Sequence, residues 1–243
     1  MQRIPLFTAA SASANGVSMP VRPVIDLASG QVVSVDLRDV PGSDPLSMAD
    51  TLFQALIRFA NRMSPERTSL SLQLDSRTLC DPHFPGRAAQ ALKRQGVAPD
   101  RLTLYFQDQD CLARGMAALD MLIALKRRGF LLGLDIKSLE LLPSLYVERL
   151  PVDILRLDPL DIMDVAVNME SAALASQFVA FAGNLLMHTA ARGVRHENQL
   201  AMLKRLGFTF GQGPYFAMPA LPEALPAPSP SEREDAAGRN RPS

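Results

Sequence analysis

Alternation of strand-like and helix-like segments most constrains how this 243-residue chain can fold. Short runs such as SLSLQL at 69–74 and LLGLDI at 131–136 are each followed by a segment with helical periodicity. Repeated strand–helix units of this kind give parallel strands joined by crossover helices. Eight such strands in a chain of this length favour a closed α/β barrel over an open sheet.

The expected barrel domain covers residues 20–220, between two polar ends. Its first two strands, 21–27 and 32–37, are joined by ASGQ, a hairpin signal, so one strand should run antiparallel. The Ala/Ser-rich residues 1–19 are expected to form a flexible leader, and the Pro-, Ala- and charge-rich residues 221–243 a disordered tail. The remaining strands are expected at 69–74, 102–106, 131–136, 153–158, 187–191 and 208–210, with helices at 47–63, 86–95, 112–128, 139–148, from 170 onward and at 197–206.

The charge and cysteine content excludes several classes of partner. Lys and Arg number 25, as do Asp and Glu, so no overall field attracts a nucleic acid polymer or an anionic membrane. Cys80 and Cys111 are too few for a disulfide framework, and neither they nor the three histidines have metal-binding spacing. No apolar stretch is long enough to span a bilayer. We therefore expect a cytoplasmic protein without a cofactor.

Two stretches of the second half resemble the EAL family of bacterial cyclic di-GMP phosphodiesterases. LLGLDIKSLELLPSLYVERLPVDILRLD at 131–158 is similar to the family's LDDFGTGYSSLxxLxxLPVDxLKID, without a gap. AARGVRHENQLAMLKRLGFTFGQGPYFAMP at 190–219 is similar to AEGVETxxQxxxLxxLGxxxxQGYxFxxP. The opening PVIDLASGQVVSVD at 23–36 resembles PIVDLxTGxVVGxE. The resemblance implies a modified TIM-like (β/α)8 barrel of the EAL type, whose first strand is antiparallel.

The family cleaves cyclic di-GMP with two divalent metals held by oxygen ligands, and most of those positions are altered here. Asp36 stands for the glutamate of the EAL motif and is followed by Leu37 and Arg38, while Tyr105 stands for a second ligand glutamate. Asp135 keeps one aspartate of a pair whose neighbour is Ile136. Arg156 replaces the lysine of KID, Arg192 and Arg195 replace the two glutamates of EGVE, Gln73 replaces the ligand asparagine, and Gln212 is retained.

These replacements invert the charge of the expected metal cage, so the resemblance predicts neither a metal nor a catalytic residue. The arginines have three interpretations. Their planar donors can hold the phosphates of cyclic di-GMP, or they can neutralise the leftover Asp135 and Asp158 inside the protein. Some can instead point into solvent, as Arg195 on a loop easily could. The candidate phosphate-binding residues are Asp36, Arg38, Asp135, Arg156, Asp158, Arg192, Arg195 and Gln212.

The expected function is that of a catalytically inactive EAL-like regulator in bacterial signalling of the motility or biofilm type. It would act as a cyclic di-GMP receptor or by binding a protein partner. Two alternatives stay open: residual cyclic di-GMP phosphodiesterase activity, and a scaffold that binds proteins without any nucleotide.

Overall fold

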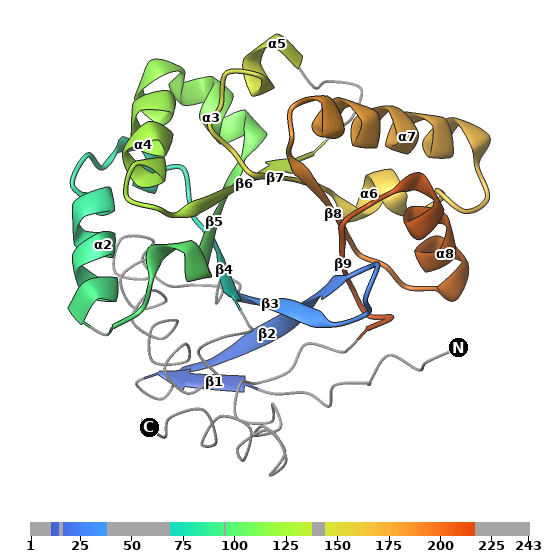
Figure 1. The fold of residues 1–243 in the computed structure, drawn as a ribbon, viewed down its shortest axis with the longest axis horizontal. Coiled ribbons are helices and arrows are strands. Elements are labelled where there is room, and N and C mark those ends of the chain that lie inside the picture. Colours follow the sequence, from blue (N-terminus) through green and yellow to red (C-terminus); the bar gives the residue numbers. More distant parts are fainter. Residues whose placement is uncertain (1–10, 15–16, 38–68, 95, 138–143, 217–243) are drawn as a thin grey trace, which may run out of the picture.

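Eight strands form a closed ring in the computed structural model, which describes residues 11–14, 17–37, 69–94, 96–137 and 144–216 (Figure 1). Strands β3 to β9 pair in chain order and in parallel, and β2 closes the ring by pairing antiparallel with both β3 and β9. The expected barrel with an antiparallel first strand is confirmed. The ring consists of β2 (Val17–Asp26), β3 (Val32–Leu37), β4 (Ser69–Gln73), β5 (Leu102–Gln107), β6 (Leu131–Ile136), β7 (Ile154–Leu157), β8 (His188–Arg192) and β9 (Phe210–Gln212).

A further strand, β1 (Ser11–Ala14), lies outside the ring. It pairs antiparallel with the beginning of β2, where Ser11 lies opposite Pro20 and Ala14 opposite Val17. Where the sequence suggested a flexible leader up to residue 19, residues 11–14 and 17–19 therefore belong to paired strands. Backbone hydrogen bonds alone can order such a segment, even though its small side chains give little hydrophobic signal.

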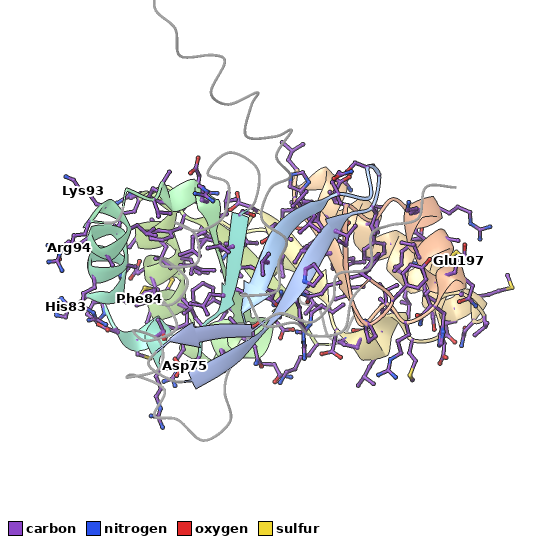
Figure 2. The ribbon with its side chains drawn as sticks, turned by 90° about the horizontal axis from the view of Figure 1, so that it is seen from below. Asp75, His83, Phe84, Lys93, Arg94 and Glu197 are labelled. Carbon is purple, nitrogen blue, oxygen red and sulfur yellow. The ribbon has the colours of Figure 1, made fainter. Side chains whose placement is uncertain are left out.

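The helices surround the ring on its outside (Figure 1). Figure 2 shows the barrel from the side, with Lys93 and Arg94 of α2 at one outer edge and Glu197 of α8 at the opposite edge. In the described part of the chain no helix is long and apolar enough to cross a membrane. The helices are α2 (Phe84–Arg94), α3 (Asp108–Arg114), α4 (Met116–Lys126), α5 (Ser144–Val147), α6 (Pro159–Ile162), α7 (Met169–Asn184) and α8 (Glu197–Leu206).

One helix prediction is wrong. The periodicity predicted a single helix over residues 112–128, but the chain forms α3 and α4 with a break at Gly115. Gly115 has φ 53° and ψ −120°, a conformation that only glycine adopts at little cost. The expected helix at 47–63, the beginning of the one at 139–148, and the tail 221–243 lie outside the described residues.

Two separate hydrophobic clusters result from closing the ring. The larger one lies between strands and helices, where Leu72, Leu104 and Leu155 are completely buried. The smaller one lies inside the ring and holds Tyr105 with Ile154. Because strand side chains alternate, each outward leucine is followed by an inward residue, and many inward residues near the C-terminal strand ends are polar. These polar side chains form the candidate site.

The end of α7 departs from the usual helix stop. The N–H of Leu186 donates to the carbonyl of Gly183 at 3.1 Å, and that of Met187 donates to Ala182 at 2.9 Å. This is the Schellman pattern, which normally places glycine in the left-handed position. Here that position holds Leu186, with φ 58°, the one non-glycine residue of the described chain with positive φ. Its side chain is 93% exposed, so little packing offsets the strain.

Substituting Leu186→Gly should raise the free energy of unfolding by about 1 kcal/mol, because it removes a left-handed leucine. Urea denaturation measures the change. Gly207, with φ 89°, holds the same position after α8, and a Cβ there would meet only Val179 at an ordinary 3.5 Å. Gly207→Ala should therefore destabilise by a similar amount. If the free energy of unfolding changed in the same direction in both variants, this explanation would be wrong.

Candidate ligand site at the barrel mouth

The C-terminal strand ends bring most of the candidate residues together inside the ring. Strand register places Asp135 beside Arg156, Gln73 beside Tyr105 and Arg192 beside Gln212. Parallel strands of a closed barrel direct their C-terminal ends to one mouth, so residues far apart in sequence converge there. The convergence predicted from the strand ends is therefore confirmed for these positions.

Arg156 is the centre of this group and is only 2% exposed. Its Nε donates to Oδ1 of Asp135 at 2.5 Å and its Nη2 donates to Oδ2 at 3.0 Å, a bidentate pair. Nη2 also donates to Oε1 of Gln73 at 2.9 Å. Nη1 lies 3.5 Å from Oδ2 of Asp36. Burial works to lower the pKa of Arg156, but the charges of Asp135 and Asp36 outweigh it and raise the pKa above its ordinary value.

Asp36 is fully buried beneath the mouth. It accepts hydrogen bonds from Oγ of Ser71 at 3.0 Å and from Nε2 of Gln212 at 3.3 Å, besides its ion pair with Arg156. A buried carboxylate requires such partners, because its desolvation is otherwise very costly. Asp36 therefore has an internal role in the barrel.

Tyr105 lies against the same guanidinium group. The Cζ of Arg156 is 3.5 Å from the centre of the Tyr105 ring, a cation–π contact shielded from solvent. Burial raises the pKa of Tyr105, so its phenol stays neutral. Gly133 makes room for the ring, since a Cβ at that position would lie 2.2 Å from Cε1 of Tyr105. This pairing was not predicted from the sequence, although Gly133 interrupts a strand of mostly apolar residues.

The other candidates take different positions. Arg192 is half-buried, and its Nη1 lies 3.4 Å from Oδ2 of Asp135. Arg195 is exposed on the loop after β8. Asp158 is the N-cap residue of α6, and its side chain accepts a hydrogen bond from the N–H of Leu160. The counter-ion of Arg156 predicted at Asp158 is instead Asp36. Arg38 lies outside the described residues.

A cavity of about 200 Å³ opens above the buried group. Arg22, Arg192 and Arg195 contribute to its wall together with Gln212, and none of the described residues that line it is acidic. Arg22 was absent from the predicted set. It lies opposite Asp36 in the β2–β3 hairpin, so the alternation of that hairpin could have placed it at the mouth. Arg156 does not line the cavity.

Two glycines shape the rim of this cavity. Gly193 has φ 81°, and a Cβ there would lie 2.6 Å from Cβ of Pro159. A Cβ on Gly213 would lie 2.3 Å from the backbone nitrogen of Val194. That nitrogen donates to the carbonyl of Gln212 at 3.1 Å, which joins the loops after β8 and β9. The retained glycines thus hold Arg192 and Gln212 next to each other.

The family model of the EAL domain matches residues 46–219. The chain belongs to the EAL domain family. In Pseudomonas aeruginosa, the bifunctional diguanylate cyclase/cyclic di-GMP phosphodiesterase MucR is 31% identical over 135 residues, covering 56% of this chain and 20% of MucR. The cyclic di-GMP phosphodiesterase NbdA of the same organism is 29% identical over 135 residues, 56% of this chain and 17% of NbdA. The chain thus spans about a fifth of the length of these relatives.

Solved EAL domains share the fold. The EAL domain of Mycobacterium smegmatis DcpA superposes with a TM-score of 0.77 at 18% identity, covering 93% of this chain and 99% of that one. The EAL domain of Pseudomonas aeruginosa FimX, bound to c-di-GMP, superposes with a TM-score of 0.71 at 19% identity, covering 84% and 90%. At such identities the likeness establishes the barrel architecture of this EAL domain.

The residues described here do not fit the two metals that the family implies. Two divalent cations require several oxygen ligands free to coordinate them. Among the described residues no cluster of three or more His, Cys, Asp or Glu side chains could hold a metal. Asp36 and Asp135 are instead paired with Arg156, and a cation beside that guanidinium would meet like charge.

Proposed function

We propose that this EAL domain is a non-hydrolysing regulatory module of bacterial cytoplasmic signalling, which binds cyclic di-GMP through its phosphates and without metal. The observation that carries the proposal is that the arginines at the mouth occupy two different kinds of position. Arg156 neutralises the buried carboxylates, whereas Arg22, Arg192 and Arg195 line an open cavity. Relatives whose names describe cyclic di-GMP phosphodiesterases support the choice of ligand.

The charges at the mouth favour an anionic group over a cation. Arg192 neutralises Asp135 only in part, because Arg156 already makes the bidentate pair with that carboxylate. Guanidinium groups hold phosphate oxygens by paired hydrogen bonds and are more weakly hydrated than ammonium groups. Gln212 adds an amide at the same rim. A bridging phosphate of cyclic di-GMP would meet these donors without displacing the buried Arg156.

The absence of hydrolysis follows in this proposal from the missing ligands. Arg156 pairs with both Asp36 and Asp135, and the ring of Tyr105 lies against its guanidinium group. Neither side chain coordinates a divalent metal when the phenol is neutral and the guanidinium charged. Restoring a single ligand should not restore activity, since catalytic groups that act as a unit are not additive.

Isothermal titration calorimetry with cyclic di-GMP tests the proposal. We expect saturable binding that EDTA leaves unchanged, no linear product with Mg²⁺ or Mn²⁺, and at least a tenfold loss of affinity in Arg192→Ala, the range for hydrogen bonds to charged groups. Arg195→Ala should cost less because solvent screens that side chain. The exposed Arg94 of α2 provides the control, and Arg94→Ala should leave affinity unchanged.

Three results would contradict the proposal. Loss of cyclic di-GMP binding in EDTA would show that the site requires a metal. Metal-dependent product formation would establish residual phosphodiesterase activity. If calorimetry detected no binding of cyclic di-GMP, the arginines would be counter-ions within the protein and not phosphate ligands.

An exposed apolar surface favours a second candidate function, nucleotide-independent protein binding. Leu160 and Met163 are 73% and 54% exposed, and Val167 and Met169, which follow, are 77% and 90% exposed. Clustered exposed apolar residues often mark contacts with another protein. Under this alternative, cyclic di-GMP leaves the melting temperature unchanged, whereas under the first proposal it must raise it.

A further inference from the structure

A second cavity, of about 300 Å³, lies inside the ring at the end opposite the arginine-lined mouth. Five of its lining residues are the first residues of their strands: Ser69, Leu131, Ile154, His188 and Phe210. The beginnings of parallel strands meet at the N-terminal face of a barrel, whereas the EAL family's ligand chemistry uses the C-terminal face. We refer to this space as the lower cavity.

The lower cavity exists because small side chains occupy part of the barrel interior. An eight-stranded barrel is normally filled by layers of bulky branched side chains. Here Ser34, Ser71 and Thr103 from three adjacent strands line the lower cavity instead. Tyr105 also lines the lower cavity, and its ring contacts Arg156 of the upper group.

The hydroxyl side of the lower cavity contains one unsatisfied group. Oγ of Ser71 donates to Asp36 at 3.0 Å, and Oγ of Ser69 donates to the carbonyl of Val33 at 3.1 Å. Ser34 is 8% exposed, and its Oγ has no hydrogen-bond partner in the described part of the chain. A buried hydroxyl without a partner is destabilising, so a molecule that bonds to Ser34 would be stabilised by it.

The opposite side is apolar, and the cavity as a whole is close to neutral. Ile154 packs with Phe210. The ring centroids of Phe210 and of His188, at the rim, are 5.6 Å apart. Among the described lining residues the one carboxylate is that of Asp153, and it is already occupied by an ion pair with Lys126 and a 2.8 Å hydrogen bond from the N–H of Leu132. No carboxylate is therefore free to meet a cation, and the described lining holds no Lys or Arg that would meet an anion.

We propose that the lower cavity is a ligand site for a small, uncharged aromatic molecule with one hydrogen-bonding group. The polar group bonds to Ser34, and the ring lies against Ile154 and Phe210. A cavity of about 150 Å³ accommodates benzene, so this one admits roughly twelve non-hydrogen atoms. The compound 2-naphthol has this size and one hydroxyl, and it is uncharged at neutral pH.

Titration of the full chain with 2-naphthol, followed by calorimetry and NMR, tests the site. We expect one saturable site, with weaker binding of naphthalene, which lacks the hydroxyl, and none of 2-naphthalenesulfonate, which is charged. Ser34→Ala should weaken 2-naphthol binding about fivefold, as for one neutral hydrogen bond. The same variant removes an unsatisfied hydroxyl, so the ligand-free protein should be at least as stable as the parent.

Three further variants make the result decisive. Ser34→Ile fills the lower cavity with a residue that suits a strand, and it should abolish binding while keeping the fold. Ser176→Ala, at an exposed serine of α7, and Arg192→Ala, at the other end of the barrel, should bind 2-naphthol normally. Absence of saturable binding would mean that the cavity holds only water and would overturn the proposal. Equal binding by Ser34→Ile, or by the sulfonate, would overturn it as well.

Discussion

Replacing Arg156 with leucine should lower the free energy of unfolding by about 3–5 kcal/mol, the range measured when one partner of a buried ion pair is removed. Arg156 is the cation that both Asp36 and Asp135 face, and all three side chains are at least nine-tenths buried. Without it two carboxylates would share a space closed to water. Arg192, 3.4 Å from Asp135, can compensate for only one of them.

Urea denaturation of Arg156→Leu measures this loss, and Arg195→Leu provides the exposed control, with an expected change within about 0.5 kcal/mol. Adding Asp36→Asn and Asp135→Asn to Arg156→Leu should recover part of the stability, because the uncompensated charges are then gone. A loss below about 1 kcal/mol in Arg156→Leu, or no recovery in the triple variant, would show that the three groups are not coupled as an ion network.

Substituting Gly133→Ala should lower the free energy of unfolding by about 2–3 kcal/mol, toward the upper end of the usual cost of overpacking. The added Cβ would lie 2.2 Å from Cε1 and 2.3 Å from Cδ1 of Tyr105. The ring cannot move away easily, because the guanidinium of Arg156 lies 3.5 Å from its centre. A single methyl group would therefore disturb the inner cluster and the ion network together.

A double-mutant cycle with Tyr105→Val tests this explanation. Valine keeps a strand-forming residue and removes the ring atoms that the new Cβ would meet, so Gly133→Ala should cost little in that background. Gly183→Ala on α7 is the matched control, since no atom lies within 4 Å of its added Cβ and alanine favours a helix. If Gly133→Ala costs the same with and without the Tyr105 ring, the clash is not the cause.

Local signals predicted several elements closely. Helix α8 runs from Glu197 to Leu206 as expected, because amphipathic periodicity and the glycine at 207 act within a few residues of each other. Strands β3 and β6 also have their predicted bounds. The break between α3 and α4 escaped prediction, since the apolar pattern continues through Gly115 and only the backbone conformation interrupts it. The pairing of β1 with β2 escaped prediction too, because it leaves almost no trace in the pattern of side chains.

The sequence by itself determined the barrel and most of the residues at its mouth, because strand–helix alternation and motif spacing are properties of the chain read in order. Only the tertiary structure decided what each arginine does. Arg156 and Arg195 were both candidate phosphate ligands, yet one is enclosed by Asp36, Asp135 and Tyr105 and the other faces solvent. Burial and the distance to a counter-charge set the role of a guanidinium group, and both depend on strands that meet only when the ring closes.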